Sequence, residues 1–332
     1  MADERPDDPR SARIASRRRV LAAAAMAPVL TGVPAGARAL PAGTRERAPV
    51  EPVTTSLADW GDVGRALGRS GDMKRFMYHT GLPRRDLTVL SHGVRISPAL
   101  ALGTHVSFVR YADGSTLLMG DCVVTEHELQ GFVDVLQEHG ITPTAIHKHL
   151  LAHTPQIWWV HVHAHGHDPV TVAGGLRAAF ERTGTPPYDP VTAAPPVDLD
   201  TAAIDAALGV GGTADDGVYR CTFARRETIT HGPVVLPPGL GAMTSVTFQP
   251  LGGGRAALTG DLVMTAPEVQ PALVALRRAG IDLVELHHHN LTDEPRLFFV
   301  HYWAVGDAVG LARGLRRAVD ATNVVPMAQG VG

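Results

Sequence analysis

The feature that most constrains the fold of this chain is a histidine pattern that occurs twice. In each copy an H-x-H pair is followed by eleven residues and then by a third histidine. The two copies comprise His147, His149 and His161, and then His287, His289 and His301. They are 140 residues apart (287 − 147 = 140), and the same offset relates two Gly-Asp pairs at 120–121 and 260–261. One long repeat of this kind indicates two similar folded units, because solenoids repeat at much shorter periods.

The repeat extends well beyond the histidines. The segment "GDCVVTEHELQGFVDVLQEHGI" begins at Gly120 and matches "GDLVMTAPEVQPALVALRRAGI", which begins at Gly260. Weaker matches continue upstream of both segments. We therefore predict two repeat units at 53–183 and 201–326, which are ordinary sizes for folded domains. The segment between them, 184–200, contains five prolines and is predicted to be an extended linker.

The N-terminal residues 1–39 are predicted to be a twin-arginine-type signal peptide. Residues 16–21, "SRRRVL", resemble a twin-arginine export motif, and a short apolar stretch follows. The sequence Ala37-Arg38-Ala39 suits cleavage near Ala39, so we expect export to the periplasm or beyond. The apolar stretch is too short for a membrane span, and no transmembrane span is expected in the mature chain. No cysteine stands at the expected cleavage point, so a lipid anchor is not predicted.

Composition indicates a globular protein, with 45% hydrophobic and 19% charged residues. A formal net charge of −3 gives no reason to expect nucleic acid as a partner. The two cysteines, Cys122 and Cys221, are not equivalent in the repeat. Cys122 aligns with Leu262 and is expected to pack as a small apolar residue, while a disulfide between the two cysteines stays an alternative.

Sequence patterns predict the element order αβββαββα in each unit. Thr125 with Glu128, and Thr265 with Glu268, have the spacing of capping boxes that begin helices. The alternating segment 104–111 is followed by Asp-Gly and a second apolar run, which is typical of a hairpin. Because the strands come mainly in hairpins, the fold class is predicted to be α+β with mainly antiparallel sheets.

The histidines fall on two further predicted strands, 142–151 and 156–165, that turn at 153–156. A hairpin centred on that turn would place His149 opposite His161 and His147 opposite His163. Paired Cβ atoms lie about 4.5–5.5 Å apart. Imidazoles at that separation can reach one ion at about 2.0–2.1 Å each. The candidate metal ligands are therefore His147, His149, His161, His163, His287, His289 and His301.

Neutral imidazoles favour a divalent transition metal, with Zn expected first and Cu or Fe as alternatives. An open coordination position would make a bound water nucleophilic. Asp121 and Asp261 are the candidate catalytic residues, as proton acceptors or as groups that orient the ligands. The alternative is that both aspartates only satisfy turn amides. Glu285 is a further candidate in the second copy, where the first copy has Ala145.

The two copies differ in ways that leave several arrangements open. Histidines at 153, 163, 165 and 167 correspond to Asp293, Trp303, Val305 and Asp307. One unit could bind metal catalytically while the other is structural, both triads could face one shared cleft, or the extra histidines could form a surface patch that sequesters metal. The arginine pairs at 84–85 and 225–226 are predicted to form a solvated basic edge, with anion binding as the alternative.

The chain resembles a known family through "GDLVMT", "EVQPALVALRRAGI", "LHHHNLTDEPRLFFVHYWA" and "DAVGLARGLRRAVD". These segments are similar to the LppY/LpqO family of bacterial exported proteins, which is catalogued by a domain of unknown function, and the resemblance spans Leu57 to Thr322. It implies an exported α+β protein with two repeats and no known reaction. Named members are lipoproteins, whereas this chain lacks their lipobox cysteine. Members resemble H-N-H at the first histidine pair, where this chain has Lys148 and His288.

Two classes of function follow from the sequence. The first is an exported metalloenzyme that uses the histidine triad for hydrolysis, hydration or redox chemistry. The second is a non-catalytic exported protein that binds metal or a small-molecule or cell-envelope ligand. The chain contains no nucleophile-elbow, Walker, dinucleotide-binding, H-E-x-x-H or C-x-x-C motif. A purely structural two-domain protein, which would bind no metal, is a third possibility.

Overall fold

The computed structural model describes residues 48–187 and 194–327. The predicted signal peptide and its cleavage position near Ala39 lie outside the described residues, as does part of the predicted linker, 188–193. The other predicted elements can be compared with the structure directly.

Repeat one consists of short helices and antiparallel strands. In chain order these are η1 (Leu57–Trp60), α1 (Gly61–Leu67), β1 (Asp72–Lys74), β2 (Met77–Pro83), β3 (Leu90–Ser91), β4 (Val94–Arg95), α2 (Pro98–Ala101), β5 (Gly103–Arg110), β6 (Thr116–Thr125), α3 (Glu126–Glu138), β7 (Thr142–His147), β8 (His153–Thr154), β9 (Ile157–Gly166) and α4 (Pro169–Phe180).

Repeat two has the same succession, except that its described residues contain no equivalent of η1 or α2 and that one strand, β19, is added. Its elements are α5 (Thr201–Leu208), β10 (Thr213–Asp215), β11 (Val218–Arg225), β12 (Ile229–His231), β13 (Val234–Leu236), β14 (Met243–Gly252), β15 (Arg255–Thr265), α6 (Ala266–Arg278), β16 (Asp282–His287), β17 (Asp293–Glu294), β18 (Leu297–Asp307), α7 (Ala308–Val319) and β19 (Val324–Pro326).

Each repeat forms one main sheet with the same strand order. The orders are β1-β2-β5-β6-β9-β7 and β10-β11-β14-β15-β18-β16, with β19 added beside β11. The strand pairs are antiparallel throughout both sheets, so the predicted α+β class with two similar halves is confirmed. Without the shortest elements, the observed order matches the predicted αβββαββα.

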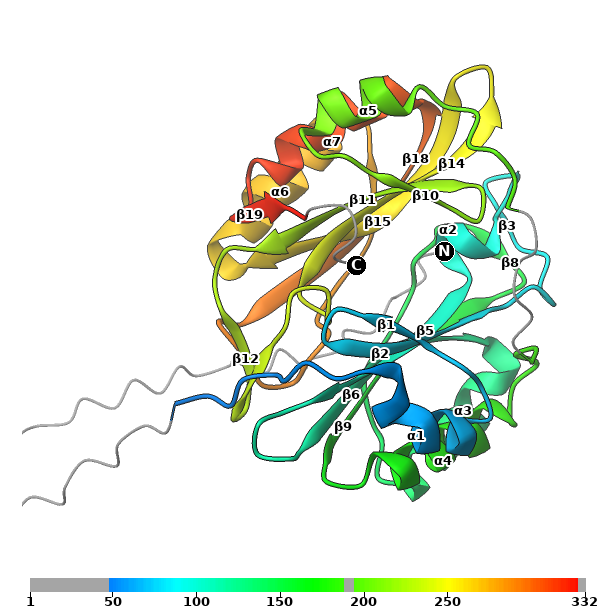
Figure 1. Ribbon diagram of the computed structural model, residues 1–332. Coiled ribbons are helices and arrows are strands. Elements are labelled where there is room, and N and C mark those ends of the chain that lie inside the picture. The colour runs from blue at the N-terminus through cyan, green and yellow to red at the C-terminus, as the bar shows by residue number, and fades with distance from the viewer. Residues whose placement is uncertain (1–47, 188–193, 328–332) are drawn as a thin grey trace, which may run out of the picture. The chain divides into compact units, whose positions relative to one another are not determined.

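The two main sheets face each other, and helices cover their outer faces. Helices α1, α3 and α4 pack on the sheet of repeat one, and α5, α6 and α7 pack on that of repeat two (Figure 1). Alternation along β5 explains this layering. Val106 and Phe108 point into the core beneath the helices, while Val109 points into the core between the sheets. The inner faces are therefore available for a site that both repeats build.

Two three-stranded sheets close the space between the main sheets. One has the order β4-β3-β8 and the other β13-β12-β17. Residues around the first, such as Val89 and Ile96, share a core with Ala257 and Trp303 of repeat two. Conversely, Ile229 and Val234 of repeat two share a core with Met77 and Val109 of repeat one. Each repeat thus covers part of the inner face of the other.

The predicted register of the histidine hairpin is wrong, and the small sheets explain why. His161 lies opposite Ala145 instead of His149, and His147 lies opposite Trp159 instead of His163. The physical reason is that residues 148–156 leave the main sheet, since β8 pairs with β3. The predicted tight turn at 153–156 is therefore a longer excursion, and β7 and β9 pair only beyond it.

The predicted capping boxes are present, and each is joined to a buried arginine. Glu128 caps α3 by accepting from the Thr125 amide at 2.8 Å, and its carboxylate also accepts from the Arg84 guanidinium at 2.8 Å. Asp86 pairs with the same guanidinium at 2.8 Å. In repeat two, Arg225 pairs in the same way with Glu268 and Glu227.

The prediction of a solvated basic edge is therefore wrong for Arg84 and Arg225, whose side chains are 1% exposed. Long charged side chains are buried only where carboxylates and carbonyls satisfy all their donors, as happens at these two positions. Cys122 and Cys221 are free and buried in separate cores beneath the two sets of helices, so the alternative of a disulfide is excluded.

The first prediction concerns this arginine. Arg84→Met should lower the free energy of unfolding by about 3 kcal/mol, because it leaves the partly buried Glu128 carboxylate and the Val123 carbonyl without their donor. Arg85→Met is the matched control, since Arg85 is 37% exposed and its pair with Asp216 should contribute less than about 1 kcal/mol. Urea unfolding at neutral pH measures both values, and equal losses would contradict the prediction.

Candidate metal centre

The six repeated histidines gather between the two sheets. His147 ends β7, His149 follows it by two residues, and His161 lies within β9. Their counterparts His287, His289 and His301 occupy the same places at β16 and β18. Nε2 of His147 lies 2.9 Å from Nε2 of His149, so the H-x-H pair meets in the site although His149 lies beyond the end of β7.

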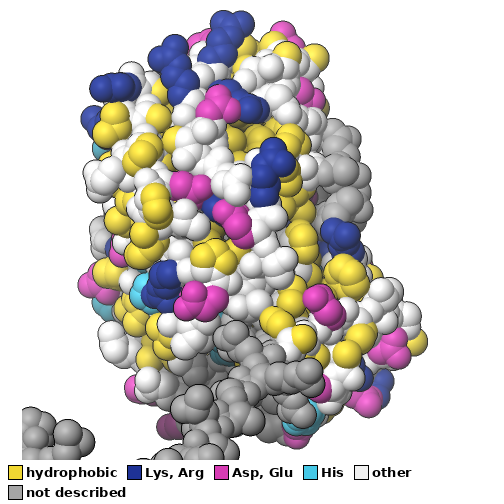
Figure 2. All heavy atoms as spheres, turned by 90° about the vertical axis from the view of Figure 1, so that its left-hand side faces the viewer, with side chains coloured by type: hydrophobic (Ala, Val, Ile, Leu, Met, Phe, Trp, Pro, Cys, Tyr) yellow, Lys and Arg dark blue, Asp and Glu magenta, His cyan; other side chains and the backbone are white. Residues whose placement is uncertain are grey.

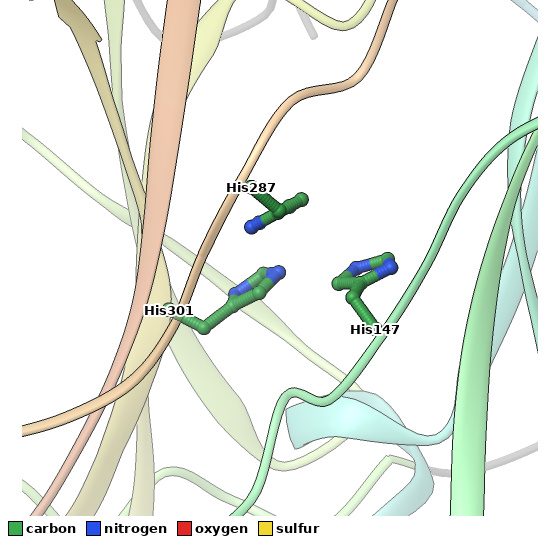
Figure 3. Close-up of side chains that lie close together, drawn as sticks. All are labelled: His147, His287 and His301. Atoms are coloured by element: carbon green, nitrogen blue, oxygen red, sulfur yellow. The ribbon is translucent and has the colours of Figure 1, made fainter. Parts of the chain in front are cut away.

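The histidines of the two repeats interleave into one cluster. The rings of His147 and His287 stack with their centroids 4.3 Å apart. His149 lies 3.8 Å from His301 between ring centroids, and His161 lies 4.1 Å from His289. Figure 3 shows His147 from repeat one facing His287 and His301 from repeat two. The arrangement in which both triads share one site between the units is therefore the one that the structure contains.

Three groups of side chains in this cluster could each hold an ion. Within a group, all ligand atoms lie within 4.8 Å of one another. Among the described residues, the groups are His147 with His287 and His301, His161 with His287 and His289, and Asp121 with His147 and His161. Two of the three groups take ligands from both repeats, so an ion bound there would join the repeats.

The two aspartates face this cluster. Asp121 lies in β6 directly opposite His161, and Asp261 lies in β15 directly opposite His301. Oδ2 of Asp121 lies 3.1 Å from Nε2 of His149, and Oδ2 of Asp261 lies 2.9 Å from Nε2 of His289. The alternative in which the aspartates satisfy turn amides is wrong, because both lie within strands.

These separations suit ligand atoms placed around one ion. Metal–nitrogen bonds of about 2.0–2.1 Å in tetrahedral geometry put neighbouring ligand atoms about 3.3 Å apart. The contacts of His149 with His147 and with Asp121, at 2.9 and 3.1 Å, are close to that value. A small movement would therefore convert the observed cluster into a coordination sphere.

Backbone carbonyls orient three of the rings. Nδ1 of His301 lies 2.9 Å from the Gly260 carbonyl, Nδ1 of His161 lies 3.4 Å from the Gly120 carbonyl, and Nδ1 of His289 lies 3.0 Å from the Gly241 carbonyl. A carbonyl accepts only, so Nδ1 of His161 and of His301 carries the proton and Nε2 keeps its lone pair. These two Nε2 atoms are buried and make no hydrogen bond with a described residue, whereas Nε2 of His289 faces the Asp261 carboxylate.

The glycines of the repeated Gly-Asp pairs have a steric role. A Cβ atom at Gly120 would lie 2.7 Å from the His105 carbonyl, and one at Gly260 would lie 2.1 Å from the Ser245 carbonyl. Neither position accepts a side chain without displacement of a neighbouring strand. The Gly-Asp repeat therefore combines a close approach of strands with a carboxylate on the site face.

One member of each adjacent aromatic pair supports the cluster. His149 stacks on Trp159 with centroids 4.4 Å apart, and His289 stacks on Phe299 at 3.4 Å. Trp158 and Phe298 pack on the helix-covered sides of their sheets. The two residues of each adjacent pair therefore face opposite sides of their sheet, as alternation along a strand requires.

The electrostatics favour neutral rings beside ionised carboxylates. Burial, with repulsion from the neighbouring histidines, holds the pKa values of His147 and His161 well below the ordinary range. Burial lowers the pKa of His287 to about 2 and that of His301 to about 4. For Asp121, burial raises the pKa but His161 and His149 outweigh it, so the pKa is well below its ordinary value. Neutral imidazoles and a carboxylate are what a transition metal needs as ligands.

His163 and the other extra histidines do not join this cluster. His163 lies against His231 with ring centroids 4.3 Å apart and belongs to none of the three groups. His153 contacts the Leu150 carbonyl and Ile157 within its own loop, and His165 contacts Ser115. On the face drawn in Figure 2, histidine atoms are few and scattered. The proposed surface patch for metal sequestration therefore has no structural support there.

The contacts across the repeats were not predictable from the sequence. Glu285 does not approach the cluster as a ligand but accepts from the Lys148 amide of the other repeat at 2.7 Å. The Thr144 hydroxyl donates to the His289 carbonyl at 2.6 Å. His105, the neighbour of Asp121 on β5, was also missed. Its alternation with Val106 along the strand was the signal that could have placed it on the inner face.

The fold and the cluster define a duplicated α+β protein with a histidine–aspartate centre between its repeats. The sequence matches the family described as Domain of Unknown Function (DUF1259) at residues 61–182 and again at 202–321. These matches cover more than half of the chain, so the protein belongs to that family. None of the helices that the structure describes is both long and apolar enough to cross a bilayer.

Other comparisons add little. No curated protein matches the chain. Among solved structures, the trimeric bacterial microcompartment shell protein PduB matches 78% of this chain and 96% of its own, with 11% identity and a TM-score of 0.20. That TM-score is too low to carry an argument about fold or function.

The second prediction concerns pH. In the metal-free protein, the free energy of unfolding should fall as the pH drops below about 6.5, because unfolded imidazoles bind protons there while the buried rings do not. Each ring that stays neutral contributes a slope of about 1.4 kcal/mol per pH unit. For His301 the loss should level off near pH 4, where its folded form titrates.

Urea unfolding between about pH 7.5 and about pH 4.5 measures this slope. His301→Asn should make it shallower, because the amide can still donate to the Gly260 carbonyl but does not titrate. His167→Ala, at an exposed position, is the control and should keep the slope of the natural protein. Stability that is constant or rises on acidification would contradict the prediction.

Proposed function

We propose that this protein binds one or two divalent transition-metal ions at the histidine–aspartate cluster between its repeats. The observation that carries the proposal is the pair of buried Nε2 atoms on His161 and His301, which make no hydrogen bond with a described residue while their Nδ1 atoms face backbone carbonyls. This pairing fixes the tautomer and the direction of a lone pair, as it does in protein metal sites.

The donor set favours Zn²⁺ first, with copper and iron as alternatives. Imidazoles suit all three metals, and a carboxylate is compatible with zinc and iron. No thiolate takes part, because Cys122 and Cys221 are buried in other cores. Besides the three groups named above, the contacts of His149 with Asp121 and His301, and the equivalent contacts of His289 with Asp261 and His161, favour one ion in each of these two sets.

The geometry is compatible with hydrolytic chemistry. The side chains of His149 and Asp261 are 16% and 14% exposed, so water can reach the edge of the cluster. An ion in such a site lowers the pKa of a bound water toward about 7. An aspartate that does not bind the ion would then accept the proton of that water, which is the catalytic role predicted for Asp121 and Asp261. His163 would take no part as a ligand.

The second candidate is a non-catalytic metal-binding protein. The nearly complete burial of the side chains of His147, His161 and Asp121 favours it, because closed coordination leaves no position for a substrate. For both candidate functions we propose export through a twin-arginine signal and membership of the LppY/LpqO group. A cell-envelope or small-molecule ligand is compatible with either.

The third prediction tests the metal site directly. Elemental analysis of the purified protein after dialysis should find about one or two equivalents of a single metal. His149→Ala and His289→Ala should each weaken retention of metal by about 10-fold or more. His301→Ala should also disturb the ion that His149 binds, since their rings are in contact across the repeats.

His167→Ala is the matched control, because His167 is exposed and lies outside the cluster. It should retain the metal content of the natural protein. If the protein acquires no stoichiometric metal after loading with zinc, copper or iron, the proposal is wrong. Loss of both ions in every cluster variant would instead show that the two ions bind as one unit.

The fourth prediction concerns stability. An ion that binds only the folded protein should raise the free energy of unfolding by about 2.7 kcal/mol at a free concentration 100 times its dissociation constant. Thermal unfolding with added metal, and again after a chelator, measures this shift. The shift should disappear in a His161→Ala/His301→Ala double variant, because both proposed ions then lose a ligand. A shift that survives in this variant would place the bound metal elsewhere.

A further inference from the structure

A row of inner-face residues crosses the sheet of repeat one and leads to the proposed metal centre. Gly81 of β2 pairs with His105 of β5, His105 pairs with Asp121 of β6, and Asp121 pairs with His161 of β9. Alternation places these four residues on one face. His105 is therefore next to Asp121 on the side away from His161.

The space in front of the Gly81 end of this row is open. A Cβ atom at Gly81 would meet no other atom within 4 Å, in contrast to the close contacts at Gly120. The His105 side chain is exposed to solvent although its strand lies in the middle of the sheet. The exposed ring of His105 and the open position at its paired neighbour Gly81 border one open space, which is called the hollow below. Asp121 is the next residue of the row after His105.

Basic side chains from both repeats surround the hollow. His79 of β2 holds its ring 6.0 Å from that of His105 between centroids, with Nδ1 3.0 Å from the Ser107 hydroxyl. Arg220 of β11 reaches across from repeat two and donates to the Ala99 carbonyl of repeat one at 3.0 Å. Lys74 ends β1, is half-buried and makes no hydrogen bond or close ion pair with a described residue.

The charges of Lys74 and Arg220 are only partly compensated. Asp215 lies 3.4 Å from Arg220, but its side chain is 61% exposed, and Asp72 is also exposed. Both acids are therefore on the solvent side of the group. Burial and repulsion from Arg220 lower the pKa of Lys74, and burial with Lys74, His105 and Arg220 lowers that of His79. An anion in the hollow would relieve this repulsion.

Repeat two does not reproduce this group. Ser245 replaces His105 as the β14 neighbour of Asp261, and Thr247 occupies the place of Ser107. Arg220 is the counterpart of His79. Its side chain extends toward repeat one instead of toward Asp261. The basic hollow therefore adjoins only the Asp121 side of the duplicated centre.

We propose that the hollow formed by Gly81, His105, Lys74, His79 and Arg220 is an oxyanion subsite that holds a carboxylate or phosphoryl group beside Asp121. The inference rests on the proposed metal centre for its catalytic meaning, because the anionic group would anchor a substrate whose reacting part lies at that centre. Chemistry is then confined to the half of the site that contains Asp121, while the half that contains Asp261 holds the structure together.

Calorimetric titration of the metal-free full-length protein at low ionic strength tests this proposal, since screening weakens such binding. The probes are inorganic phosphate and acetate, titrated separately. We expect saturable binding of at least one, and the tighter probe identifies the anionic group. Lys74→Gln should weaken binding by about 10-fold, as removal of one charge-assisted contact does.

Gly81→Leu should abolish binding by filling the open space while leaving all charges in place. Arg278→Gln removes an exposed arginine on the outer helix α6 and should bind anions as the natural protein does. Gly81→Leu should also keep the metal content of the natural protein, which separates loss of the subsite from misfolding.

The outcomes separate this proposal from the proposed function. If neither anion binds the metal-free protein, or if Lys74→Gln and Gly81→Leu bind as the natural protein does, the subsite is refuted even where metal binding is intact. The subsite is also refuted if anions bind only when metal is present and bind equally well to both variants, because the anion then binds the metal ion itself. If anion binding follows Lys74 and Gly81 but no metal binds, the subsite stands and the metal proposal fails.

Discussion

The burial of imidazoles between two sheets is the constraint on which the rest of this structure depends. An unpaired polar atom in a protein interior costs about 1–3 kcal/mol. Nδ1 of His147, both ring nitrogens of His287 and Nε2 of His301 are in that state, as are Oδ1 atoms of Asp121 and Asp261. Against a typical net stability of about 5–15 kcal/mol, this cost is large. The outer cores are complete without the site, and a bound ion would remove part of this cost.

The distribution of the cores explains how one chain supports such a centre. Each repeat has its own core between sheet and helices, in which Phe132 or Leu276 is fully buried. The inner faces instead share cores that mix residues of both repeats, such as Met119 with Phe299. Each repeat can therefore form its sheet independently, while the site exists only when the inner faces meet. An ion with ligands from both repeats would couple the two halves.

How much the sequence predicts depends on the range of the interaction. Local patterns located the helices, the capping boxes of Thr125 and Thr265, and the strands that carry the histidines. The predicted strand 142–151 is shorter than expected, because β7 ends at His147 and His149 lies beyond it. The register of β7 with β9 was wrong, because the pairing of β8 with β3 depends on residues about 60 positions away in the chain. The burial of Arg84 was missed for the same reason, since Glu128 lies 44 positions away.

The two halves of the site differ in their residues, and the sequence alone shows these differences but not their consequence. A duplicated site begins with two equivalent centres, and the identical spacing of the triads is what such a pair retains. The positions that differ are neighbours of the aspartates, with His105 beside Asp121 and Ser245 beside Asp261. A substitution at such a position leaves the candidate metal ligands in place and changes only the side chains beside them. Since Arg220 crosses to the repeat-one side, both repeats contribute charge to one hollow. Recognition of a ligand can therefore belong to one half of the centre, while its assembly requires both.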